Sequence, residues 1–298
     1  MHFNESQINI AKFLKKVSPI YQNYFLWKKL FREQFENGYK ALICFLKNYA
    51  YERQGAAAAY SKIALKCFSN RYQDGHNWRV PTKDDAKDLW EDYKNIAKRD
   101  YNLFDNRTGK VKVNQTHNPV NADRGVVDKL VSNNALNIAV YIRDLISCGD
   151  TTKAYNFIKE IRGIGEKIAS FYLRDIAYLA RLDEENISDL YLLQPIDTWL
   201  EQTFKILFNF DVPKNLQEKQ KLIVDLCKES KVSSISFNQG AWVLGSQIAG
   251  EFETFKRALF NCSFAQKIIR NHIKEKEGYL REVRNVLDSL RRTADNSG

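Results

Sequence analysis

The chain lacks the features of a membrane or secreted protein. No apolar run approaches the ~20 residues that a helix needs to cross a bilayer. The first five residues, from Met1 to Glu5, match neither a secretory signal peptide nor an arginine-rich presequence. These absences predict a protein with no membrane partner. We expect it in the cytoplasm, associated with the nucleoid of a prokaryote, or in the nucleus of a eukaryote.

The chain also lacks paired cysteines and clustered histidines. Its 5 cysteines are scattered without a Cys-x-x-Cys pair, and its 4 histidines are widely spaced. Metal sites need several such ligands close together, and disulfide frameworks belong to oxidising compartments. We therefore expect reduced, mostly buried thiols, no metal and no other cofactor. The cysteines are Cys44, Cys67, Cys148, Cys227 and Cys262.

Acidic residues are outnumbered. The chain has 46 lysines and arginines against 36 aspartates and glutamates, a formal net charge of +10, and a pI of about 9.2. This excess indicates a polyanionic partner, nucleic acid before others. A basic protein without such a partner is the plain alternative. At 298 residues, 44% of them hydrophobic, the chain can form one large domain or two small ones.

Strand patterns longer than a few residues are absent, whereas apolar residues recur at helical spacing along almost the whole chain. Thr82, followed by acids at 84 and 85, is an expected N-cap. These patterns predict an all-α fold. The predicted helices cover about 21–31, 39–49, 56–68 and 82–101. Helices resume from Asp123 and include 135–148, 151–162 and 166–181, and they continue with the helix at Asp197 and with 215–231, 235–249 and 263–292. A loop or short hairpin is expected over 102–121 and a polar loop over 183–189.

Two glycines interrupt the helical pattern near the middle of the chain. Gly163 and Gly165 lie between the predicted helices 151–162 and 166–181. Glycine has no Cβ, so this turn tolerates positive φ and lets another backbone approach closely. The helix that follows starts with free N–H groups, which bind phosphate oxygens. The pattern predicts a hairpin that contacts DNA, and a purely structural turn is the alternative.

A second short motif follows the hairpin. Asp197 stands two residues after Pro195 and thirty residues after Lys167 (197 − 167). Together the two motifs resemble the helix-hairpin-helix and Pro-x-Asp elements of the helix-hairpin-helix (HhH-GPD) DNA glycosylase superfamily. The chain is most similar in character to archaeal-type 8-oxoguanine DNA glycosylase/AP lyases and to endonuclease III without its iron–sulfur cluster. The resemblance covers residues 135–250 well and 40–70 weakly.

This resemblance implies a two-lobed helical fold with a cleft between the lobes, and a monomer that binds double-stranded DNA containing a damaged base. It equates Lys167 with the Schiff-base lysine of the bifunctional enzymes and Asp197 with their catalytic aspartate. The other implied site residues are Arg162, Gly163, Ile164, Gly165 and Gln54 for DNA binding, and Trp242 and Trp199 for the base pocket.

The positions of Lys167 and Asp197 also have a chemical rationale. The dipole at a helix start disfavours an ammonium ion, so it favours the neutral amine that attack on a sugar C1′ requires. The same dipole favours an ionised Asp197, which can stabilise a positively charged sugar in the transition state. Two alternatives stay open: Lys167 only grips a phosphate, or Asp197 only caps a helix.

Two further residues have weaker motifs. Gln54 precedes a glycine and an alanine-rich helix start, similar to the glutamine of endonuclease III-like enzymes that fills the gap left by a flipped nucleotide. A glutamine at an ordinary helix junction is the alternative. Trp242 lies in 237–245, which resembles the helix after the catalytic aspartate, so its ring either stacks on a flipped base or packs in the core.

Two positions depart from the family pattern. Arg162 stands where the family usually has proline, which loses rigidity but adds a cation beside the phosphate path. The Lys167–Asp197 separation exceeds the family's usual gap of under twenty residues, as it does in the archaeal 8-oxoguanine enzymes. This gap and the missing cluster cysteines make 8-oxoguanine the expected substrate, by analogy.

The expected organisation has three parts. Residues 1–121 form an N-terminal helical region that contributes to both lobes, 122–250 form the helix-hairpin-helix catalytic core, and 251–298 are basic C-terminal helices that pack back on the N-terminal region. The expected activity is excision of a damaged base with an associated β-elimination lyase step. The alternatives are a monofunctional glycosylase in which Asp197 activates water, and a non-catalytic helix-hairpin-helix DNA-binding protein.

Overall fold

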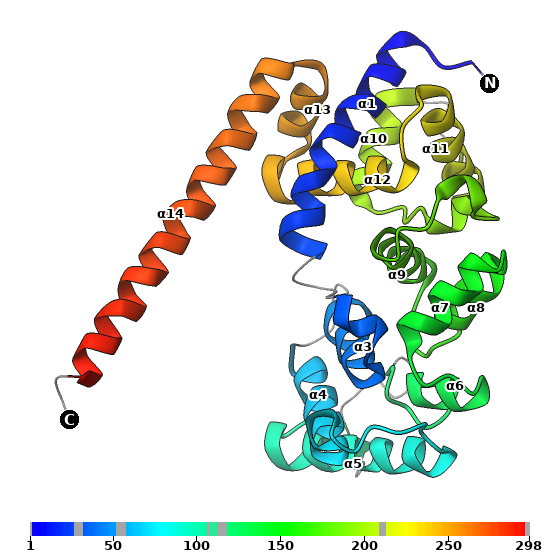
Figure 1. The fold of residues 1–298 in the computed structure, drawn as a ribbon, viewed down its shortest axis with the longest axis vertical. Coiled ribbons are helices and arrows are strands. Elements are labelled where there is room, and N and C mark those ends of the chain that lie inside the picture. The colour runs from blue at the N-terminus through cyan, green and yellow to red at the C-terminus, as the bar shows by residue number, and fades with distance from the viewer. Residues whose placement is uncertain are drawn as a thin grey trace.

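The computed structural model describes residues 2–26, 32–51, 58–105, 108, 110–111, 118–208 and 213–295, with the side chains of the last helix described as far as residue 278. Helices make up most of it (Figure 1), so the prediction of an all-α fold is confirmed. The α-helices are α1 (Glu5–Ile20), α3 (Gly38–Phe45), α4 (Ala58–Tyr72), α5 (Lys83–Tyr101), α6 (Val126–Ser132), α7 (Ile138–Ser147), α8 (Thr151–Lys159), α9 (Glu166–Leu179), α10 (Thr198–Phe208), α11 (Leu216–Ser230), α12 (Ser234–Val243), α13 (Phe252–Phe260) and α14 (Cys262–Asp295).

Short helical turns of 3₁₀ or π type join or extend these helices. They are η1 (Tyr21–Leu26), η2 (Arg32–Phe35), η3 (Leu46–Ala50), η4 (Gln73–Gly75), η6 (Glu184–Asn186), η7 (Leu190–Leu193) and η8 (Leu244–Ala249). Two strands of two residues, β1 (Phe104–Asp105) and β2 (Lys110–Val111), pair antiparallel. This hairpin matches the prediction of a loop or short hairpin over 102–121.

The ends of α5 follow directly from the sequence. The Thr82 hydroxyl accepts a hydrogen bond from the Asp85 N–H at 3.2 Å, and the Asp85 carboxylate accepts one from the Thr82 N–H at 2.7 Å. This capping box satisfies two N–H groups that the first helical turn leaves free. Asn102, at φ 51°, ends the helix in the left-handed conformation. The predicted helix from Thr82 to Tyr101 is confirmed.

Two helices were missing from the sequence predictions. α1 begins with an Asn4–Gln7 capping box, and its apolar face, with Ile10 and Leu14, is buried. α13 is short but strongly amphipathic, with Phe255 fully buried. The predicted helix over 235–249 is α12 followed by the π-helical turn η8, so its regular part ends at Val243.

Helix α9 lies in the middle of the body (Figure 1). α1 and α10 to α13 gather on one side of it, α3 to α5 on the other, and α7 and α8 pack against α9 itself. Tyr172 of α9 is fully buried and meets the rings of Phe45 and Tyr49 at 4.9 and 5.0 Å. Burying one such ring contributes about 2–3 kcal/mol. The chain thus places the helix that follows the hairpin at the centre of its packing.

The two C-terminal helices differ in how much of the body they contact. α13 contacts α1 and η8. α14 contacts α13 and η8 and then extends away from the body (Figure 1). The side chains of α14 beyond residue 278 lie outside the described ones. Among the described helices, none has both the length and the apolar character that crossing a bilayer requires.

Candidate active site at the start of helix α9

The predicted hairpin forms between α8 and α9. Gly163 takes a positive φ of 78°, which glycine tolerates without strain. Ile161 and Ile164 on either side of it are buried, and the Ile164 N–H donates to the Ile161 carbonyl at 3.0 Å. The Arg162 N–H donates to the carbonyl of Arg124, in the segment before α6, at 2.8 Å. Apolar anchors and backbone bonds therefore hold the turn.

The start of α9 is open to a ligand. Gly165 is its N-cap residue, in extended conformation at φ −98°, and no side chain caps the helix there. A Cβ added at Gly165 meets no atom within 4 Å. The first N–H groups of the helix, at residues 166–168, therefore face a space that another molecule can enter. Such a helix start attracts a phosphate oxygen.

Lys167 stands in the first turn of α9 and is exposed. Among the described residues it has no ion-pair partner within 4.0 Å. Its neighbours differ, because Lys159 pairs with Glu166 at 2.9 Å and Lys129 pairs with Glu160 at 2.5 Å. The ammonium of Lys167 is therefore left available to a ligand.

Arg162, the cation predicted to lie beside the phosphate path, is paired with an acid in the structure. Its guanidinium forms an ion pair with the Asp123 carboxylate, and its Nε donates to the Asp123 carbonyl at 2.5 Å. The side chain is 17% exposed. Its charge is already compensated, so its role in the fold is to tie the hairpin to the segment before α6.

Asp197 is the N-cap of α10. Its Oδ1 accepts the N–H of Leu200 at 2.8 Å, and its carbonyl accepts the N–H of Glu201 at 2.9 Å. Burial raises the pKa of Asp197, while the Leu200 N–H and the charges of Arg174 and Lys167 oppose that rise. The carboxylate caps a helix and sits among positive groups at once.

Lys167 and Asp197, thirty residues apart in the chain (197 − 167), interact electrostatically in the folded protein. The charge of Lys167 lowers the pKa of the Asp197 carboxyl, so the two lie within electrostatic range. No salt bridge within 4.0 Å joins them in the described structure. A partly buried carboxylate beside an exposed, unneutralised amine is suited to chemistry at a positively charged centre.

The two predicted base-pocket tryptophans have different surroundings. Trp242 is partly exposed, and its ring meets those of Tyr21 and Phe25 edge-on, each at a centroid distance of 5.4 Å. Trp199 packs on Phe255 at 5.3 Å and covers Gly245, where an added Cβ would come within 2.3 Å of the indole. Trp199 therefore fills the space between α10, η8 and α13, and Trp242 is the tryptophan beside a partly exposed aromatic cluster.

Gln54 lies outside the described residues. In the part of the chain that the structure describes, no group of three or more histidine, cysteine, aspartate or glutamate side chains could hold a metal ion.

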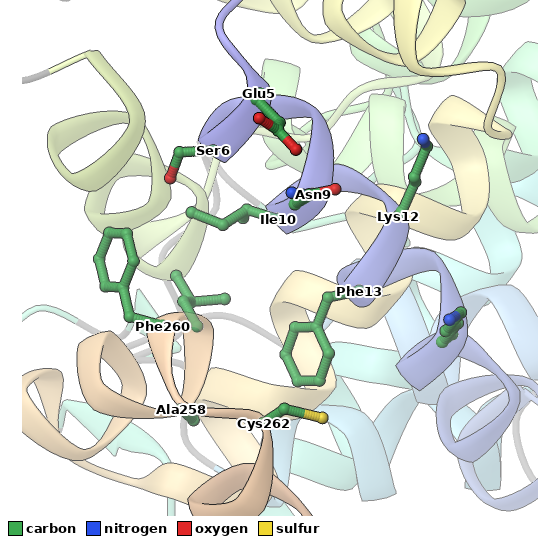
Figure 2. Close-up of a pocket in the computed structure, with 11 residues that line it drawn as sticks. Glu5, Ser6, Asn9, Ile10, Lys12, Phe13, Ala258, Phe260 and Cys262 are labelled. Carbon is green, nitrogen blue, oxygen red and sulfur yellow. The ribbon is translucent and has the colours of Figure 1, made fainter.

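A groove of about 600 Å³ opens between α1 and the α13–α14 junction. Figure 2 shows Ile10 and Phe13 of α1 facing the α13 segment that carries Phe260. None of the predicted site residues lines it. The groove is therefore separate from the start of α9.

Three buried polar residues near the site were not predicted from the sequence. Arg174 and Asp175, adjacent on α9, are both fully buried, and so is Asn238 of α12. An arginine–aspartate pair inside the apolar span 168–177 is the signal that could have revealed them, because charges are rarely buried unless they are paired.

Comparison with known proteins places the chain beside one archaeal relative. No protein-family model and no solved structure matches it. It resembles an uncharacterized protein of Methanocaldococcus jannaschii. The two are 23% identical over a 249-residue alignment that covers 76% of this chain and 58% of the relative. The match therefore spans little more than half of the relative's length.

Proposed function

We propose that the chain is a DNA glycosylase with an associated AP lyase activity, built on a two-lobed helical fold with the DNA cleft between the lobes. The observation that carries the proposal is that Lys167 is exposed in the first turn of the hairpin helix, has no ion-pair partner among the described residues, and acts electrostatically on the partly buried Asp197. An amine nucleophile and a carboxylate are the two groups that the reaction requires.

The proposed chemistry begins with a damaged nucleotide flipped out of the duplex. The neutral Lys167 amine attacks C1′, the bond from C1′ to the base breaks, and the base leaves with its bonding electrons and takes up a proton. The Asp197 carboxylate stabilises the positive charge that develops on the sugar. The bound amine opens the sugar ring to an imine. Loss of a proton from C2′ then expels the 3′ phosphate by β-elimination.

DNA binding is supported by backbone and charge together. The uncapped N–H groups at 166–168 and the open space beside Gly165 suit a phosphate oxygen. The net charge of +10 favours a polyanion. Because Asp123 neutralises Arg162, the backbone amides and Lys167 supply the local attraction.

The flipped base is proposed to stack near Trp242. Its partly exposed indole, with Phe25 and Tyr21, forms an aromatic cluster on η1 and α12. Aromatic faces bind bases of any sequence, so the cluster supports a purine or pyrimidine alike. Oxidised purine, 8-oxoguanine first, is our proposed substrate on the analogy of the long Lys167–Asp197 separation.

Borohydride trapping on duplexes that each carry one lesion tests the proposal. Reduction of the imine to a stable protein–DNA adduct on 8-oxoguanine duplex is the expected result. Base release without an adduct would assign a monofunctional glycosylase in which Asp197 activates water. Tight binding with neither outcome would assign a DNA-binding protein in which Lys167 grips phosphate and Asp197 only caps α10. Duplex without a lesion is the control for each arm.

A further inference from the structure

A buried hydrogen-bond network lies around the middle of α9. Arg174 and Asp175 are both 0% exposed. The Nε and Nη2 groups of Arg174 donate to one oxygen of the Asp175 carboxylate at 2.9 and 2.8 Å. The hydroxyls of Tyr21 and Tyr49 donate to the other oxygen at 2.7 and 2.8 Å. Asp175 thus links α9 to η1 on one side and to η3 on the other.

The network reaches the Asp197 segment through Asn238 of α12, which is 0% exposed. Its Oδ1 accepts a hydrogen bond from Arg174 Nη1 at 2.8 Å. Its Nδ2 lies 3.2 Å from the Pro195 carbonyl and 3.3 Å from Gln194 Oε1 and donates to them. One buried amide therefore joins α9 to the backbone two residues before Asp197.

A second buried amide makes a parallel connection. Gln220 of α11 is 3% exposed, and its Nε2 donates to the Gln194 carbonyl at 2.9 Å and to the Ser170 hydroxyl at 3.3 Å. The carbonyls of Gln194 and Pro195 are consecutive. Both are thus held to α9, one through Ser170 and one through Arg174. Two connections at neighbouring carbonyls restrict rotation of the segment as well as its distance from α9.

The connections attach to the face of α9 that carries Lys167. Ser170 and Arg174 follow Lys167 by three and seven residues (170 − 167 and 174 − 167), the spacing of one helical face. Seven residues of helix span about 10 Å. Asp197 is electrostatically coupled to both Lys167 and Arg174, at the two ends of that interval. α9 thus serves as a common frame for the amine and the carboxylate.

We propose that Arg174, Asn238 and Gln220 are positioning residues that hold the Asp197 segment at a set distance and orientation from Lys167. None of them has to touch DNA. They act through the carbonyls of Gln194 and Pro195. Their effect on catalysis rests on the proposed glycosylase function, whereas their effect on the position of Asp197 does not.

Asn238→Ala, with Gln239→Ala as its matched control, tests the proposal. Gln239 is the next residue of α12, is also an amide that is 0% exposed, and accepts a hydrogen bond from Gln22 at 2.9 Å. The described structure gives it no bond to residues 194–197. Asn238→Ala removes three buried hydrogen bonds and Gln239→Ala removes one, so Asn238→Ala should lower the melting temperature more, and the two variants are compared on Asp197 rather than on stability. Differences between the two variants then report the connection to Asp197.

The first measurement needs no DNA. Carboxyl ¹³C resonances of aspartate-labelled protein are titrated with pH, and Asp197→Asn identifies the Asp197 signal. The groups that act on Asp197 are Lys167, Arg174 and the amides of Trp199 and Leu200. Releasing the segment from Arg174 weakens a favourable charge interaction, so the titration midpoint should rise by roughly half a pH unit or more in Asn238→Ala. It should not move in Gln239→Ala.

The second measurement is single-turnover base excision on lesion duplex. We expect Asn238→Ala to be at least about tenfold slower, with its acid limb moved to higher pH and its DNA affinity within about threefold of wild type. Gln239→Ala should stay within about threefold in rate.

The outcomes separate this inference from the proposed function. An Asp197 titration that is identical in the two variants overturns the inference, even where the wild type excises a base. A differential titration in a protein that excises no base supports the inference and removes the glycosylase proposal. If Asn238→Ala unfolds, Gln220→Ala enters the same comparison with Gln239→Ala, and equal midpoints again overturn the inference.

Discussion

At the scale of single residues, Lys167 and Asp197 differ in their exposure and in how firmly hydrogen bonds hold their side chains. Lys167 is exposed and has no ion-pair partner among the described residues, while the cations nearest the turn are all paired with acids. Asp197 is partly buried and commits one oxygen to capping α10. A neutral or charged ligand group can reach the amine, but the carboxylate stays where the fold puts it.

Replacing Lys167 with Gln should abolish the borohydride-trapped adduct and strand nicking while lesion binding persists. An amide nitrogen cannot form an imine. Gel analysis of trapped complexes measures this. Lys153→Gln is the control. Lys153 is an exposed lysine near the start of α8, the helix before the hairpin, and its replacement removes the same charge. Covalent trapping by Lys167→Gln would show that another residue forms the imine.

Asp197→Asn should fold and bind DNA but lose several orders of magnitude in single-turnover excision. The asparagine oxygen can still cap α10, so stability is retained, whereas the lost charge costs ~3 kcal/mol or more in the transition state. Asp197→Ala should lose about 1 kcal/mol of stability in addition. If Asp197→Asn keeps a rate within a few-fold of wild type, the carboxylate is only a cap.

The wild-type rate should also fall in acid. Burial raises the pKa of Asp197 above the ordinary 3.8. Only the ionised carboxylate stabilises a cation, so excision is lost as pH falls through this raised value. The acid limb should therefore lie above pH 3.8, and Asp197→Asn should lack it. A wild-type profile that stays flat down to that pH would remove ionised Asp197 from the mechanism.

At the scale of elements, the two glycines of the hairpin differ in backbone conformation and in the space around them. Gly163 has φ +78°, which a side chain rarely adopts, whereas Gly165 has φ −98° and open space around it. The first glycine is required by the conformation of the turn. The second is required only if another molecule comes close to the backbone.

The two glycines should therefore respond differently to alanine. Gly163→Ala should destabilise the protein by about 1–2 kcal/mol, because it places a Cβ in the left-handed region. Gly165→Ala should leave the melting temperature nearly unchanged but weaken binding to duplex DNA about tenfold or more, by blocking the approach of a phosphate to the N–H groups at 166–168. Thermal melts and binding isotherms measure the two effects. Unchanged DNA affinity of Gly165→Ala would make the hairpin a structural turn.

At the scale of the whole molecule, the net charge of +10 should make DNA binding strongly dependent on salt. A protein that neutralises about five phosphates releases counterions, so the log–log slope of affinity against salt should be near −4 to −5. Titrations between low and moderate salt measure this slope. An affinity that does not change would place the excess positive charge away from the DNA.

The sequence by itself determined the helical class and the local elements of the site. Helical periodicity identified most helices, and Thr82 with Asp85 marked the start of α5 to the residue. The glycines at 163 and 165 marked the hairpin. These features depend on neighbours within a few residues, which a sequence displays directly. α13 was not predicted although α8, of the same length, was.

Only the tertiary structure decided which distant residues meet. It brought Lys167 within electrostatic range of Asp197, paired Arg162 with Asp123, and gave Trp199 a packing role against Gly245. It also connected Arg174, through Asn238, to the backbone just before Asp197. Each of these depends on how α9 packs against helices from both ends of the chain. Packing is set by the combined fit of many side chains, so no local pattern encodes it.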